Sequence, residues 1–229
     1  MHSAAVGGHI QICKFTMTKI VEKNPRRESD GITPLHIAAG RGQIELCKVL
    51  MKDNQIVNPR NNSGSTPLHY AAKKGHLEVY ELISEGSQVI NPIDVCGRTP
   101  LHYAAQNGHL LICRFILENI FVKNPQSIDK VTPLHLAAIG GHWKICQLFF
   151  ERFSKLKGYG PKNPEDFKGD TPLHCAANYG HILVCWVILD NIEDKNHLND
   201  EELTPFDLVL KKRFFAICNM ISSSDDMEL

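Results

Sequence analysis

Histidine and cysteine are the residue types in this chain that are numerous enough to suggest metal binding or catalysis. The sequence of 229 residues contains 12 histidines and 8 cysteines. Imidazole and thiolate groups ligate zinc, and both act as bases or nucleophiles in enzymes. A histidine four residues before a cysteine would share one face of a helix with it. This spacing occurs in three pairs: His109 and Cys113, His142 and Cys146, and His181 and Cys185.

These pairs do not add up to a metal site. A closed zinc site needs four ligands that converge on one ion, whereas each of these pairs stands alone in its part of the chain. Eleven of the histidines recur in two fixed contexts. Those of the first context are His2, His36, His69, His102, His135 and His174. Those of the second context each follow a glycine and are His9, His76, His109, His142 and His181. We therefore expect no metal and no cofactor.

Other catalytic signatures are missing from the sequence. There is no glycine-rich phosphate loop and no nucleophile elbow. The carboxylates are scattered over variable positions without forming an acid–base couple. The formal net charge is +0, and the short basic runs are separate, so nothing draws the chain to nucleic acid or to a membrane surface. We expect that the protein is not an enzyme.

The first histidine context belongs to a motif that the chain repeats. The stretch Thr99–Ala105 reads Thr-Pro-Leu-His-Tyr-Ala-Ala, and near-copies start at Thr33, Thr66, Thr132 and Thr171, with a degenerate copy at Thr204. Successive threonines are 33, 33, 33, 39 and 33 residues apart. A fixed period of this size is typical of a stack of similar structural units.

Each part of the motif has a local structural role. Thr99 can cap a helix, and Pro100 suits the first helical position. Gly108 can adopt the left-handed conformation that ends the helix. The segment 109–117 then carries apolar residues at intervals of three and four, which predicts a second, amphipathic helix. One unit is therefore a helix, a turn, a second helix and a projecting loop.

The pattern T-P-L-H-x-A-A-x-x-G-H with this period resembles the ankyrin repeat family, and the resemblance covers essentially the whole chain. It implies an all-α fold, an ankyrin-repeat solenoid of helix-turn-helix units with projecting hairpin loops. It also implies that the two histidine positions are structural and hydrogen-bond the backbone of loops and helix ends.

We expect a single ankyrin-repeat domain over residues 1–229. Its predicted parts are a partial first repeat (1–30), repeats at 31–63, 64–96, 97–129, 130–168 and 169–201, a C-terminal cap repeat (202–221) and a disordered acidic tail (222–229). The first repeat lacks the capping Thr-Pro, so either its first helix is frayed or the chain is a fragment whose upstream repeats have been removed; we favour the fragment.

Six cysteines occupy one position of the second helix: Cys13, Cys47, Cys113, Cys146, Cys185 and Cys218. At such a position cysteine acts as a small buried hydrophobe, so we interpret these residues as reduced thiols. No apolar run approaches the roughly 20 residues of a membrane span, and no signal peptide is visible. We expect a cytoplasmic protein, with the nucleus as a second possibility.

Two irregularities occur in repeats five and six. Six extra residues lengthen the segment after the second helix of repeat five, which runs from Phe149 to Lys162 and is expected to form a loop. In repeat six, Trp186 stands at an outward position. The other repeats have polar residues there: Lys14, Lys48, Glu81, Arg114 and Gln147. One hypothesis is that Phe153 or Tyr159 covers the indole; the alternative is a half-exposed tryptophan.

The resemblance implies a function in protein–protein interaction through a concave groove lined by loop tips and first-helix ends. The groove residues that it implies are Arg41, Ser65, Lys73, Lys74, Arg98, Gln106, Asn107, Asp170, Asn178 and Tyr179. Their character changes from basic to mildly acidic and aromatic, which favours a protein partner that enters with an acidic segment. We expect a monomeric scaffold; the alternative is the cytosolic ankyrin region of a membrane channel or receptor.

Overall fold

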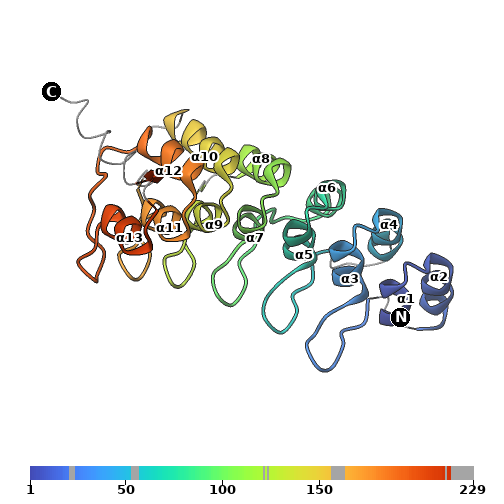
Figure 1. The fold of residues 1–229 in the computed structure, drawn as a ribbon. Helices are drawn as coiled ribbons and strands as arrows, with labels where there is room; N and C mark the ends of the chain where they lie inside the picture. Colours follow the sequence, from blue (N-terminus) through green and yellow to red (C-terminus); the bar gives the residue numbers. More distant parts are fainter. Residues whose placement is uncertain are drawn as a thin grey trace. The chain divides into compact units, whose positions relative to one another are not determined.

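A computed structural model describes residues 1–20, 24–52, 57–120, 122, 124–155, 163–214 and 216–217. Within these ranges all regular secondary structure is α-helical (Figure 1). This confirms the predicted all-α class. The chain divides into two compact units, Met1–Ile120 and Phe121–Leu229. The expectation of one domain over residues 1–229 stays a prediction.

The first unit is a stack of helix pairs. The pairs are α1 (His2–Val6) with α2 (Ile10–Lys19), α3 (Pro34–Gly40) with α4 (Ile44–Lys52), α5 (Pro67–Lys74) with α6 (Leu77–Glu85), and α7 (Pro100–Gln106) with α8 (Leu110–Asn119). The first helices contact one another in sequence, and so do the second helices. Figure 1 shows the loops of this unit projecting on the side of α3, α5 and α7.

The second unit has the same organisation. It contains α9 (Pro133–Ile139) with α10 (Trp143–Lys155), α11 (Pro172–Tyr179) with α12 (Ile182–Leu189), and α13 (Pro205–Lys212). Helix α11 packs between α9 and α13, and α10 packs against α12. The first helices again form one row and α10 and α12 the other (Figure 1).

The repeated motif builds each first helix through its cap. In α3 the Thr33 side chain accepts from the backbone N–H of His36, while the backbone N–H of Thr33 donates to Nδ1 of His36 at 3.2 Å. The Asn24 side-chain oxygen accepts a further hydrogen bond from the backbone N–H of Leu35, at 3.1 Å. Three of the amides that a helix start leaves unpaired are thus accounted for, with Pro34 at the first position having none to donate. The same box recurs at Thr66, Thr99, Thr132, Thr171 and Thr204.

The core runs between the two helix rows of each unit. The motif leucines are fully buried: Leu35, Leu68, Leu101, Leu134 and Leu173. The paired alanines beside them are buried as well, and their small side chains let neighbouring first helices approach closely. The second helices add buried cysteines, among them Cys47 and Cys146, and burial raises the pKa of both thiols to about 12. These thiols are therefore protonated and inert at neutral pH.

Repeat five departs from the expected loop after its second helix. Helix α10 continues to Lys155, so that residues 149–155 are helical. The reason is the spacing of Phe149, Phe150 and Phe153, which continues the helical period and buries all three rings. The ring centroid of Phe153 lies 5.9 Å from that of Phe149 and 6.1 Å from that of Phe150. The rest of the segment that was expected to form a loop, 156–162, lies outside the described residues.

Candidate partner-binding surface

The residues expected to line a groove sit at loop ends and first-helix ends in both units. In the first unit Arg41 directly follows α3, Lys73 and Lys74 end α5, and Arg98 precedes α7. Ser65, Gln106 and Asn107 occupy corresponding places. In the second unit Asp170 precedes α11, and Asn178 and Tyr179 end it. A continuous groove that joins all of these residues stays a prediction.

The histidine of each first helix fixes the loop of the following repeat. His69 accepts the backbone N–H of Thr66 at Nδ1, at 3.0 Å, so the ring proton of the neutral imidazole is on Nε2. Nε2 in turn donates to the carbonyl oxygen of Arg98 at 3.1 Å. The same contact joins His36 to Ser65 and, in the second unit, His135 to Asp170, each at 3.0 Å.

Burial controls the charge of these histidines. Desolvation lowers the pKa of His36 and of His69 to about 4, against the opposing effect of the carbonyl that each binds. Desolvation lowers the pKa of His135 and His174 as well. The rings are therefore neutral at physiological pH and serve as bridges between backbone groups. The resemblance to ankyrin repeats implies this structural role, and the geometry confirms it.

The second histidine context holds the ends of the first helices. Nε2 of His109 lies 3.2 Å from the carbonyl oxygen of Lys73, and Nε2 of His181 lies 2.9 Å from that of Ile139. The His109 ring lies directly against Gly75, where an added Cβ would be 2.6 Å from ring atoms. Gly75 also has a φ of 81°, which disfavours any side chain. This glycine thus allows the next repeat to hold the carbonyl of Lys73.

Neighbouring loops within each unit are hydrogen-bonded to one another. In the first unit the backbone N–H of Asn62 donates to Asp30 O at 2.9 Å, and that of Val95 donates to Ser63 O at 3.0 Å. In the second unit Phe167 N donates to Asp129 O at 3.0 Å. The loops of one unit are therefore a connected row, and Ser65 and Arg98 belong to a braced part of the backbone.

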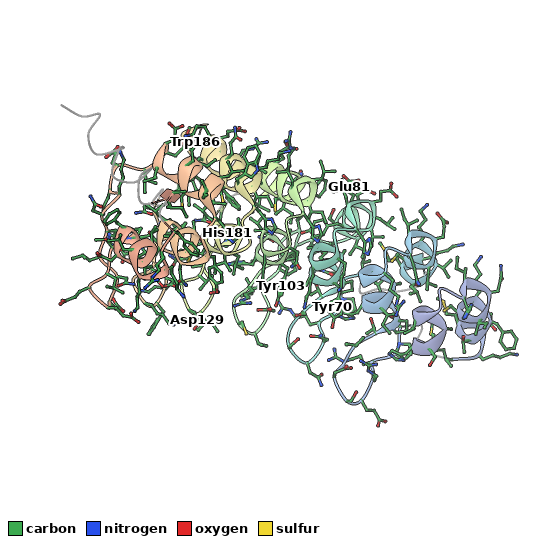
Figure 2. The ribbon with its side chains drawn as sticks, in the orientation of Figure 1. Tyr70, Glu81, Tyr103, Asp129, His181 and Trp186 are labelled. Atoms are coloured by element: carbon green, nitrogen blue, oxygen red, sulfur yellow. The ribbon has the colours of Figure 1, made fainter. Side chains whose placement is uncertain are left out.

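Two tyrosines on this surface were not predicted from the sequence. Tyr70 and Tyr103 are half-buried on α5 and α7, whereas Glu81 lies on α6 in the other helix row (Figure 2). The Tyr103 hydroxyl donates to Oδ2 of Asp94 at 2.7 Å, and Nζ of Lys73 lies 5.9 Å from the centroid of the Tyr103 ring. The sequence feature that could have identified them is the tyrosine that follows Thr-Pro-Leu-His in repeats three and four.

Some predicted surface residues use their side chains within the fold. Oδ1 of Asp170 accepts from the Asn199 amide at 2.8 Å, and the Asn107 amide donates to Tyr103 O at 2.8 Å. Tyr179 is 55% exposed, and its ring stacks on that of His181 with centroids 6.2 Å apart. Among these residues Tyr179 is the large aromatic side chain that remains exposed to a partner.

Of the two aromatic side chains that were expected to cover Trp186, Phe153 is described by the structure and Tyr159 is not. Trp186 is 57% exposed, while Phe153 is 7% exposed and its described ring contacts are with Phe149 and Phe150. Tyr159 lies outside the described residues, so its contact with the indole stays a prediction. Figure 2 shows Trp186 beside α10 and α12, and Asp129 on a loop at the other side of this unit.

Neither metal chemistry nor a membrane crossing emerges from the described residues. In those ranges no three His, Cys, Asp or Glu side chains come together as a metal site. None of the helices there combines the length and apolar character that crossing a bilayer requires.

A family model described as ankyrin repeats (3 copies) matches residues 1–92, 82–158 and 119–201. No curated protein matches the chain.

Proposed function

Because the chain belongs to the ankyrin repeat family, we propose that it is a non-catalytic module that binds a partner protein. Ankyrin repeats are generally protein–protein interaction modules, and the family is typically non-catalytic. We place the main contact on the loops and first-helix ends of the first unit. Its residues are Arg41, Ser65, Lys73, Lys74, Arg98, Gln106 and Asn107. In the second unit Asp170, Asn178 and Tyr179 offer the equivalent surface.

The observation that supports this proposal most is the rigid presentation of cationic side chains, among which Lys73 is exposed and Arg98 is half-buried. The carbonyl of Lys73 is held by His109 at 3.2 Å, and the carbonyl of Arg98 by His69 at 3.1 Å. The backbone below these side chains is thus fixed before any partner arrives. A preorganised surface loses less conformational entropy on binding, which favours affinity.

Charge favours a partner with an acidic segment. The carboxylates next to the cationic residues already have partners: Asp30 pairs with Arg27, and Asp94 accepts from Tyr103. The hydrogen bond from Arg27 lowers the pKa of Asp30 to about 2. The Asp30–Arg27 ion pair has no net charge and offsets little of the positive potential of Lys73 and Lys74, whereas the Asp94 carboxylate keeps its negative charge beside the backbone of Arg98. Such a surface accelerates the encounter with an acidic segment and sets its register.

Affinity capture from lysate, with proteins identified by mass spectrometry, tests the proposal. The intact chain is compared with the triple variant Lys73→Glu/Lys74→Glu/Arg98→Glu. A matched control, Lys14→Glu/Lys48→Glu/Arg114→Glu, makes the same change in net charge on the second helices of the first unit. Partners that the control retains and the triple variant loses support the proposed surface. Equal loss in both variants, or retention in both, overturns it.

We also propose a monomer in a reducing compartment, the cytoplasm or the nucleus. Five of the repeat cysteines are buried as free thiols: Cys13, Cys47, Cys113, Cys146 and Cys185. Intact mass after alkylation in denaturant, without reductant, counts the free thiols, and sedimentation velocity gives the oligomeric state. A disulfide in protein from cell extract prepared with a thiol-blocking reagent contradicts the compartment; a dimer contradicts the monomer.

A further inference from the structure

A groove lies between α10 and α12 on the face of the second unit that is opposite its loops. It has a volume of about 230 Å³. Helix α10 contributes Gln147, Phe150 and Glu151, and α12 contributes Trp186, Val187 and Asp190. The groove is therefore distinct from the surface discussed under the proposed function, which is formed by loops and first helices.

Trp186 is the exposed aromatic of this groove. It is 57% exposed and stands where the preceding repeat has Gln147 and the first repeat has Lys14. On the same helix Leu183 is 57% and Ile182 is 41% exposed. A helix that is apolar on every face is normally covered on every face, and clustered exposed apolar side chains mark interaction sites. The outer face of α12 thus has the character of an interaction site.

The polar lining of the groove is acidic. Glu151 and Asp190 are exposed, and neither forms an ion pair within the described residues. The other small polar groups at the groove are engaged in their own helices: Ser154 donates to Phe150 O and Asn191 to Val187 O, both at 2.8 Å. None of the described residues that line it is a lysine or an arginine. Among the described residues, the groove therefore combines a largely exposed indole with two carboxylates that form no ion pair.

We propose that this groove binds an arginine-bearing basic segment of a partner protein. A guanidinium group can stack on the indole of Trp186 while its N–H groups donate to Glu151 or Asp190. Arginine suits the site better than lysine because its planar group satisfies stacking and carboxylate pairing together. Apolar side chains flanking the arginine would cover Leu183 and Ile182.

The first unit supplies an internal comparison. Its groove between α2 and α4 has a volume of about 510 Å³ and is lined by Lys14, Lys48 and Lys52. Its one acidic lining residue, Glu45, pairs with Lys48 at 2.7 Å. An equivalent place between second helices thus has the opposite charge and no aromatic side chain. A basic segment should discriminate between the two grooves.

The experiment selects peptides of about twelve residues from a random phage-displayed library on the intact chain, with counter-selection on Trp186→Gln. Glutamine is the residue of the preceding repeat at this position, so we expect the variant to fold with unchanged thermal stability. The selected peptides are then titrated in a Trp143→Phe background. The chain has 2 tryptophans, so the remaining fluorescence reports Trp186.

The proposal expects selected peptides to contain arginine and to alter the fluorescence of Trp186. Their affinity should fall about tenfold in Glu151→Gln/Asp190→Asn, and should be unchanged in Lys14→Gln/Lys48→Gln. Peptides without basic residues, peptides that bind Trp186→Gln equally well, or a failure to enrich any peptide overturn it. Self-association of the wild type that Trp186→Gln abolishes overturns it in favour of a second copy of this chain. Because Lys73, Lys74 and Arg98 play no part, failure here leaves the proposed function standing.

Discussion

Nε2 of His69 lies 3.1 Å from the carbonyl oxygen of Arg98, and this contact joins the first helix of one repeat to the loop of the next. The same ring accepts the backbone N–H of Thr66 at 3.0 Å. One neutral imidazole therefore completes a helix cap and restrains the loop that carries a candidate binding residue. Stability and presentation of the surface depend on the same side chain.

The first prediction concerns pH. The pKa of His36 and of His69 falls from an ordinary 6.5 to about 4 on folding, so the unfolded chain binds protons more readily than the folded chain. Their stabilising effect is present above about pH 6.5 and is lost as the pH falls towards 4. Each of these two histidines should lower the free energy of unfolding by about 2 kcal/mol when the pH falls from 7 to 5. Urea unfolding at the two pH values measures the change.

A His69→Gln variant provides the control for this prediction. Glutamine does not titrate, so the variant should lose stability at pH 7 but show a shallower decline towards pH 5. A decline as steep as that of the wild type would mean that other groups cause the acid sensitivity.

The second prediction concerns the helix cap. Thr99→Ala removes the hydroxyl that accepts from the backbone of His102, and should lower the unfolding free energy by about 1 kcal/mol. Thr18→Ala is the matched control, because Thr18 is exposed on α2 and its hydroxyl donates to Phe15 O. Thermal denaturation should separate the two variants; equal midpoints would argue against the capping role.

The third prediction compares the two tyrosines of the first unit. Burial and the hydrogen bond to Asp94 raise the pKa of Tyr103, so its hydroxyl is a donor at neutral pH. Tyr103→Phe leaves the buried Asp94 carboxylate without this donor and should cost about 2 kcal/mol. Tyr70→Phe removes a bond from the neutral Asn61 amide, 3.2 Å long, and should cost about 1 kcal/mol. Chemical denaturation that ranks the variants in the reverse order contradicts this account.

The fourth prediction concerns the loop of repeat five. Lys130 has a φ of 56°, at the place where other loops have a glycine such as Gly97, with a φ of 72°. A residue with a Cβ is disfavoured there, so Lys130→Gly should stabilise the second unit by about 1 kcal/mol. Gly97→Ala makes the opposite change in the first unit and should destabilise it. A lower melting temperature for Lys130→Gly would refute the strain argument.

The sequence predicted the repeated elements and missed features that depend on neighbours. The caps followed from Thr-Pro-Leu-His because capping is local chemistry within four residues. The extension of α10 through Phe153 was not expected, because the other repeats end this helix earlier. The spacing of the phenylalanines in the sequence does not show that their rings are buried in the core. Tyr103 was missed because its partner Asp94 and the nearby Lys73 lie in other parts of the fold.

The loop between repeats three and four contains Cys96, which is exposed, while the other cysteines that the structure describes are buried. Its backbone N–H donates to Oδ1 of Asp94, and Arg98 is two residues away. A maleimide dye added to the native protein should therefore react fastest at this thiol. The chain thus comes with a natural attachment point for a fluorophore, from which the arrival of a binding partner could be followed in real time without engineering a new cysteine.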